Sequence, residues 1–310
     1  MNSTQEAFLT KFRTGCLVAN FVLYVGSVVG NGWVLLAFLK YSTLRKKECL
    51  YLIAALAFLD LTTGLTSQVF IISGLLLQTG WIESYTKFQC LLINFLQVFP
   101  GLCSQLMTSC IAFDRYQVFH SQIKYRLKNH RKYAIRSLAV VISISLSVNL
   151  SSFLGVDYSD IIYICSVGLA STEAFVGLMM CTMIFNIICV FVFYIWALYL
   201  MRKSTKPTAV VRKDVALERQ LKVTKTISVV VSCYTLFAAM PVLLLLVASM
   251  LGAPGLVLSL IGSLTDVGLA INSAVNVFIY GAKHQQLGNY LIAVLKWKPE
   301  NAVEPVKGHP

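Results

Sequence analysis

Seven long apolar segments dominate this chain and leave few options for its fold. Each is long enough to cross a lipid bilayer, which takes about 20 consecutive apolar residues. They occupy residues 17–39, 50–77, 88–118, 133–154, 173–201, 222–250 and 257–281. Only helices and closed barrels satisfy backbone polar groups in lipid, and the segments lack the apolar/polar alternation of barrel strands. We therefore predict an all-α membrane protein, a bundle of seven transmembrane helices.

The composition agrees with a membrane protein and excludes a soluble globule. Of the 310 residues 57% are hydrophobic and 13% are charged, whereas soluble domains have about 25% charged residues. The seven segments leave no room for a soluble catalytic domain. The four histidines, His120, His130, His284 and His309, lack the spacing of metal ligands. We expect a protein that is not an enzyme.

The distribution of Lys and Arg predicts the orientation in the membrane. With the N-terminus outside, only Lys11, Arg13 and Lys87 of the 26 basic residues lie on the outer side, and 23 lie on the inner side. Cytoplasmic loops are the ones that collect positive charge. We therefore expect a plasma-membrane protein with an extracellular N-terminus and a cytoplasmic C-terminus. Topology and anionic lipid, rather than nucleic acid, then account for the net charge of +13.

The segments outside the bundle are short. We predict an extracellular N-terminus at 1–16, the membrane domain at 17–281, an amphipathic helix in the inner interface at 282–297 and a cytoplasmic tail at 298–310. Asn2-Ser3-Thr4 has the pattern of a glycosylation acceptor, which makes Asn2 a candidate site.

Several motifs stand at fixed positions in the seven segments. Asp114-Arg115-Tyr116 ends the third segment, and Cys90 starts it 25 residues before Arg115, a distance of about 38 Å in a helix and so about one membrane thickness. The other motifs are Gly30-Asn31, Leu56-Ala57-Phe58-Leu59-Asp60 and Asn272-Ser273-x-x-Asn276-Val-x-x-Tyr280. With these motifs the chain resembles the rhodopsin-like (class A) family of seven-helix G-protein-coupled receptors.

The resemblance implies a receptor that activates a heterotrimeric G protein when its inner face opens. Arg115 would pair with Asp114 at rest and turn toward the G protein and Tyr280 on activation. The implied switch residues are Asp114, Arg115, Tyr116, Tyr194, Asn276, Tyr280 and Pro241, the last of which would kink the sixth helix. The family's disulfide would join Cys90 and Cys165, both on the oxidising outer side. Two free thiols are the alternative.

By the same resemblance, Asp60, Ser104, Asn272 and Asn276 would hold a sodium ion. A carboxylate inside a membrane helix is costly and persists where it faces polar partners, water or an ion. Oxygen ligands suit a small hard cation. The alternative is a protonated Asp60 that only joins helices through hydrogen bonds. We expect no other cofactor.

The chain also departs from the family pattern. Val277 replaces the usual proline after Asn276, so we expect polar packing and water to break that helix, and Ala239 replaces a common tryptophan. With Leu44-Arg45-x-Lys47-x-Cys49-Leu50, Phe99-Pro100-Gly101, and Phe113-Asp114-Arg115 leading to Tyr125, the chain resembles the Srsx group of nematode serpentine chemoreceptors. That resemblance implies a chemoreceptor, for which the membrane of a sensory neuron is a candidate location.

The ligand is the least determined feature. Gln97 stands where amine receptors place a carboxylate, which favours a neutral or hydrogen-bonding ligand. Gln97, Asp266, Tyr234 and Phe237 are candidate pocket residues, with core packing as the alternative for the two aromatic residues. An odorant, a small metabolite and a short peptide all fit. The competing function is a seven-span ligand-gated channel or transporter, which needs one continuous polar path.

Overall fold

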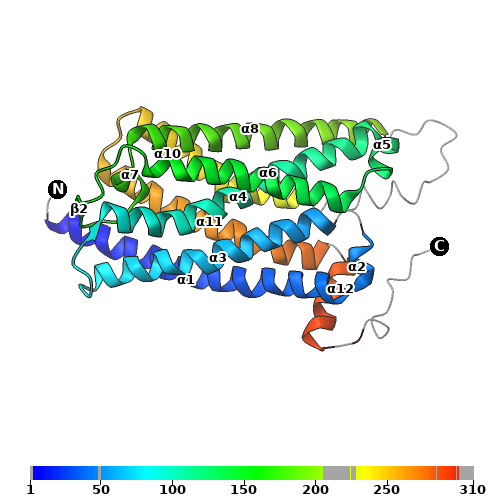
Figure 1. The fold of residues 1–310 in the computed structure, drawn as a ribbon, viewed down its shortest axis with the longest axis horizontal. Coiled ribbons are helices and arrows are strands. Elements are labelled where there is room, and N and C mark those ends of the chain that lie inside the picture. Colours follow the sequence, from blue (N-terminus) through cyan, green and yellow to red (C-terminus); the bar gives the residue numbers. More distant parts are fainter. Residues whose placement is uncertain are drawn as a thin grey trace.

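Seven long helices run side by side along the computed structural model in Figure 1, which describes residues 3–47, 50–204, 224, 228–283, 285–297 and 299. In these residues seven helices are long and apolar enough to cross a membrane. They are α1 (Ser3–Lys40), α3 (Leu50–Gln78), α4 (Lys87–His120), α6 (His130–Leu150), α8 (Glu173–Ser204), a sixth span over Ser228–Met250 and α11 (Gly255–Lys283). The predicted seven-helix bundle is confirmed.

Short elements close the two ends of the bundle (Figure 1). One end carries α2 (Ser42–Arg45), α5 (Gln122–Arg126) and α12 (Gln285–Leu295), and we call it the inner end. The opposite, outer end carries strands β1 (Tyr85–Thr86) and β2 (Ile161–Ile162), the 3₁₀ turn η1 (Ser151–Phe153) and α7 (Val167–Ala170). The two strands pair antiparallel, with Tyr85 opposite Ile162. Strands of two residues are too short for an apolar/polar alternation to predict them.

Helix α1 begins earlier than predicted. Residues 3–16, expected to be part of an extracellular N-terminus, continue the first helix without a break. No proline interrupts them, and the Thr14 hydroxyl donates to the Gln78 side chain of α3 at 2.6 Å. Asn2 lies outside the described residues. Of the predicted tail, only residue 299 is described.

Helix α12 matches the predicted interfacial helix. Leu287, Tyr290, Ala293 and Val294 are buried on one face of it, as expected for an amphipathic helix packed under a bundle. The Tyr290 ring lies 4.7 Å from the ring of Tyr41 at the inner end of α1. The prediction of an eighth helix is therefore confirmed.

The sixth span contains a π-helical turn, η2 (Thr235–Ala239), immediately before α10 (Met240–Met250). Pro241 has no N–H and cannot donate to the carbonyl of Phe237, four residues earlier, which explains the widened turn. Gly268 of α11 packs against this carbonyl so closely that a Cβ there would lie 2.1 Å from the oxygen. The kink predicted from Pro241 therefore coincides with a backbone contact between the sixth and seventh helices.

The seventh helix is not broken near Asn276. Helix α11 runs continuously from Gly255 to Lys283, so the predicted break after Asn276 is wrong. Val277, unlike proline, keeps its backbone N–H and adds no ring, so the helical hydrogen bonds continue. Its side chain packs on Gly30 of α1, where a Cβ would lie 2.9 Å from Val277 Cγ2.

Candidate functional site

A buried ion pair lies at the inner end of α4. Arg115 Nη2 donates to Asp114 Oδ2, and both side chains are almost fully buried. The Tyr125 hydroxyl, from α5, donates to the same carboxylate oxygen at 3.2 Å, and Arg115 Nη2 donates to the Tyr125 hydroxyl at 3.2 Å. The predicted resting pair is thus present, and the following loop contributes a third partner.

The loop between α5 and α6 is fixed against this pair. His130 Nε2 lies 3.1 Å from the Tyr125 carbonyl oxygen, and the two rings meet edge to face at 4.6 Å. Lys128 Nζ lies 3.8 Å from Asp114 Oδ1 and donates to Gln117 Oε1 at 2.7 Å. Burial lowers the pKa of the Lys128 ammonium, and the Asp114 charge opposes that shift.

The other predicted switch residues take different positions. Tyr116 has no described hydrogen bond to the ion pair and stacks on His120 with ring centroids 5.0 Å apart. Tyr194 of α8 donates its hydroxyl to Ser228 Oγ, which connects the fifth and sixth spans near the inner end. Tyr280 belongs to the last part of α11, but its side chain lies outside the described residues.

Asp60 is the centre of a polar cluster in the middle of the membrane. Its carboxylate is fully buried and accepts hydrogen bonds from Ser104 Oγ at 2.5 Å and from Asn276 Nδ2 at 2.9 Å. Ser273 Oγ lies 2.7 Å from Ser27 Oγ in the same region of α11 and α1. The structure therefore brings together Asp60, Ser104 and Asn276, three of the four predicted sodium ligands.

The donor set of this cluster fits a small cation. Asn272 Oδ1 and Asn276 Oδ1 are buried and have no hydrogen-bond partner among the described residues. Buried oxygens without donors, beside a carboxylate and a hydroxyl, are the ligands that a hard cation such as sodium prefers. Asn272, the fourth predicted ligand, has no hydrogen bond to Asp60 among the described contacts.

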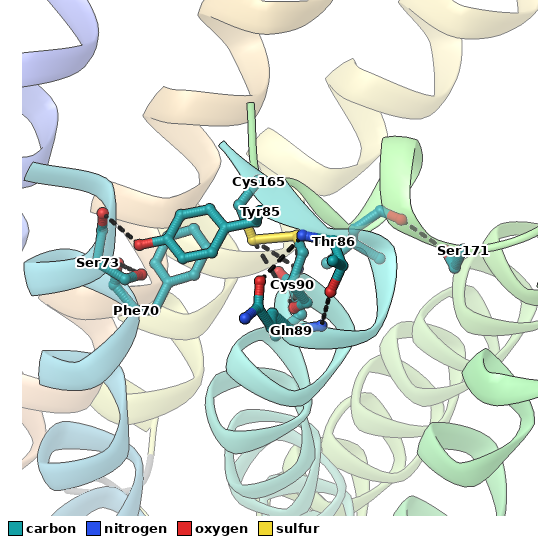
Figure 2. The surroundings of a disulfide bond; sticks show 10 residues. Phe70, Ser73, Tyr85, Thr86, Gln89, Cys90, Cys165 and Ser171 are labelled. Carbon is teal, nitrogen blue, oxygen red and sulfur yellow. Dashed lines mark hydrogen bonds between the residues drawn. A yellow bond between two sulfur atoms is a disulfide. The ribbon is translucent and has the colours of Figure 1, made fainter. Parts of the chain in front are cut away.

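The outer end is held by a covalent bond and a small sheet (Figure 2). Cys90 of α4 and Cys165 form a disulfide, as predicted. Nearby, the Tyr85 hydroxyl points to α3 and donates to the Ser73 carbonyl at 3.1 Å. Lys87 and Asp160 form an ion pair at 2.6 Å across the strands. These contacts anchor the long outer loop over the bundle.

A second polar group, which we call the outer polar cluster, lies between α1, α3, α4 and α11. It consists of Asn20, Tyr24, Ser67, Gln97 and Asp266. Ser67, Gln97 and Asp266 lie close to Tyr24, and the Ser67 Oγ is buried with no hydrogen-bond partner among the described residues. Asn20, one helical turn before Tyr24, has a buried Oδ1 with no described hydrogen-bond partner. Gln97 and Asp266 thus share one region near Tyr24, and their role in a ligand pocket stays a prediction.

Tyr234 lies elsewhere, in the helix core. It is 1% exposed and accepts a hydrogen bond from Asn186 Nδ2 at 2.9 Å, while Asn186 Oδ1 accepts one from Ser109 Oγ at 2.5 Å. On α4, Ser109 is 12 residues closer to the inner end than Gln97, which is about 18 Å along a helix. The structure therefore favours the core-packing alternative for Tyr234. Phe237 lies at the π-helical turn, where its carbonyl faces Gly268.

The Asn186 network was not predicted from the sequence. Asn186 joins α8 to α4 and to the sixth span, and it is 1% exposed. One sequence feature could have predicted it: Asn186 is an amide inside a long apolar segment. Polar side chains in membrane helices usually form hydrogen bonds with neighbouring helices.

Seven helices able to cross a membrane, with a buried acid–arginine pair at one end and a buried polar cluster between the helices, define a seven-helix membrane protein. The family model described as 7 transmembrane receptor (rhodopsin family) matches residues 30–280. The chain belongs to this family.

A curated relative agrees with that membership. The chain is 30% identical over 132 residues to "Probable G-protein coupled receptor npr-8" of Caenorhabditis elegans. The matched region covers 40% of this chain and 24% of that relative. The chain thus matches about a quarter of the relative's length.

Proposed function

We propose that this receptor activates a heterotrimeric G protein when an extracellular ligand binds near its outer end. The observation that carries the proposal is the Asp114–Arg115 pair, buried at the inner end of α4 and bonded to a loop residue. A buried arginine held by an adjacent carboxylate has two arrangements, paired within the helix or turned out to a partner. Ligands act on such an element by shifting its populations.

The part that would move on activation is the inner half of the sixth span. The Tyr194–Ser228 hydrogen bond holds the inner half of the sixth span to α8. The π-helical turn before Pro241 is a local weakness in the same span, because its hydrogen-bond ladder is interrupted there. Opening would break the Tyr194–Ser228 bond, pivot the sixth span at this turn and expose Arg115 to the G protein. With the N-terminus outside, the inner end faces the cytoplasm.

The outer polar cluster is the proposed ligand site. Asp266 is half-buried and forms no ion pair with any described residue. Its carboxylate therefore favours a ligand that donates hydrogen bonds or carries a positive charge, and Gln97 adds an amide that can donate or accept. The class of ligand is thus wider than the neutral or hydrogen-bonding ligand predicted from Gln97 alone. The Srsx resemblance supports a chemoreceptor for such small polar compounds.

Sodium is the proposed ion of the Asp60 cluster. Asp60, Ser104 and the two asparagine oxygens would hold it, and the ion would supply a positive charge that balances the buried carboxylate. Because Asn276 already bonds Asp60, occupancy would connect α3, α4 and α11 and favour one arrangement of the bundle.

The test is guanine-nucleotide exchange by the purified receptor in lipid vesicles, using a panel of purified heterotrimers. Vesicles with receptor should exchange nucleotide faster than empty vesicles for at least one heterotrimer. Ion flux across the same vesicles, with no exchange on any heterotrimer, would instead support the channel or transporter alternative.

A further inference from the structure

Asp114 has a second cation within reach. Its Oδ2 accepts from Arg115 and Tyr125, but its Oδ1 is buried and has no hydrogen-bond partner among the described residues. The ammonium of Lys128 lies 3.8 Å from this orphaned oxygen. A direct ammonium–carboxylate bond is about 2.8–2.9 Å long, so a movement of about 1 Å would complete it.

This arrangement matters when Arg115 leaves. A buried carboxylate that loses its directly bonded cation is strongly destabilising unless another cation replaces it, which would oppose any state in which Arg115 turns outward. Resting on the proposed G-protein function, we propose that Lys128 is a reserve counter-ion, which moves onto Asp114 Oδ1 and replaces Arg115 in the active state. Lys128 is then a positioning residue that favours activation without touching the G protein.

The loop holds Lys128 ready for this role. Its stem is partly buried, with 19% of the side chain exposed, and its ammonium lies over the Tyr133 ring of α6. The bond to Gln117 Oε1, on the next turn of α4 after Asp114, holds the ammonium 3.8 Å from Asp114 Oδ1 at rest. The His130–Tyr125 contacts fix the backbone on which Lys128 sits. A cation that only reached for lipid headgroups would extend outward instead.

The expected size of the effect follows from the distances. Closing the gap from 3.8 Å to about 2.9 Å, at an effective dielectric of about 20, favours the active state by up to about tenfold. Lys128→Met should therefore lower receptor-driven nucleotide exchange by up to about tenfold, while Lys128→Arg should retain most of it. Lys124→Met is the matched control, because Lys124 is exposed on α5 in the same loop, and it should leave the rate unchanged.

A second measurement needs no G protein. If Lys128 substitutes for Arg115, the melting temperature of the Arg115→Met and Lys128→Met double variant should fall by several degrees more than the sum of the single variants. Adding Asp114→Asn should remove that excess loss, because the unpaired charge is gone. Additive losses, or an excess that survives Asp114→Asn, would overturn the proposal.

The two measurements distinguish a failure of the proposed G-protein function from a failure of the reserve counter-ion. Absence of exchange by the wild-type receptor would refute the G-protein function, while the melting temperatures would still decide whether Lys128 backs up Arg115. Normal exchange by Lys128→Met beside an active wild-type receptor would refute the reserve counter-ion and leave the G-protein function standing.

Discussion

Replacing Gly268 by alanine should destabilise the receptor through a single contact between the sixth and seventh helices. The added Cβ would lie 2.1 Å from the Phe237 oxygen and 3.2 Å from its carbonyl carbon. Both atoms are backbone, so no flexible side chain can move aside. The helices must separate by more than about 1 Å to bring such a contact to ordinary van der Waals range.

The stability lost in Gly268→Ala is the difference between two opposing effects. Overpacking costs about 1–3 kcal/mol, and the better helix propensity of alanine returns up to about 1 kcal/mol. The net loss should be about 1–2 kcal/mol, which lowers the melting temperature of a chain of this length by roughly 2–3 °C. The assay is thermal unfolding of purified receptor in lipid nanodiscs, followed by a thiol-reactive dye that reaches the buried Cys103 only on unfolding.

Gly262→Ala is the matched control in the same helix. Gly262 has no atom within 4 Å of a Cβ position, so the substitution should be neutral or stabilise by about 0.5–1 kcal/mol. Equal shifts for Gly262→Ala and Gly268→Ala would show that the close approach of Phe237 and Gly268 does not exist, and the proposed pivot would lose its support.

Three further changes test other parts of the structure. Replacing choline by sodium should raise the melting temperature of the wild-type receptor but not of Asp60→Asn, because ligands stabilise the state that binds them; an equal sodium shift in the variant would reject the ion site. Tyr234→Phe should cost about 1 kcal/mol, and Asn186→Leu should cost more, because it also removes the bond from Ser109. Together they should cost less than their sum, since both remove the Asn186–Tyr234 hydrogen bond; strictly additive losses would argue against that bond. Non-reducing peptide mapping should recover Cys90 and Cys165 as one linked pair, and replacing both by serine should lower the melting temperature; finding both thiols free at the cell surface would contradict the structure.

The positions of the helices could be predicted from the sequence because every segment that crosses lipid must be long and apolar and must satisfy its own backbone hydrogen bonds. Length and apolarity located all seven, and the 25-residue spacing of Cys90 and Arg115 placed these two residues at opposite ends of α4. The Asp114–Arg115 pair and the contacts of Asp60 with Ser104 and Asn276 could be anticipated through the family resemblance.

The remaining features depend on rotation and packing of the helices, which apolar periodicity specifies poorly. Tyr234 is one example, because its role depends on which neighbour faces it, and that neighbour is Asn186. The continuous α11 is another, since replacing a proline by Val277 removes the cause of a kink and no other cause takes its place. Lys128 is a third example, because in the sequence it is one of many loop cations and only the fold places its ammonium near Asp114.

The most direct test of the account is to change the two halves of the buried pair separately and measure G-protein nucleotide exchange in lipid vesicles. Asp114→Asn removes the charge that holds Arg115, so exchange without added ligand should rise severalfold. Arg115→Ala removes the group that meets the G protein, so exchange should fall to the level of empty vesicles at equal receptor density. Opposite effects from adjacent residues cannot come from general damage to the fold. If both variants lower exchange alike, or if Arg115→Ala exchanges normally, the Asp114–Arg115 pair is not the switch.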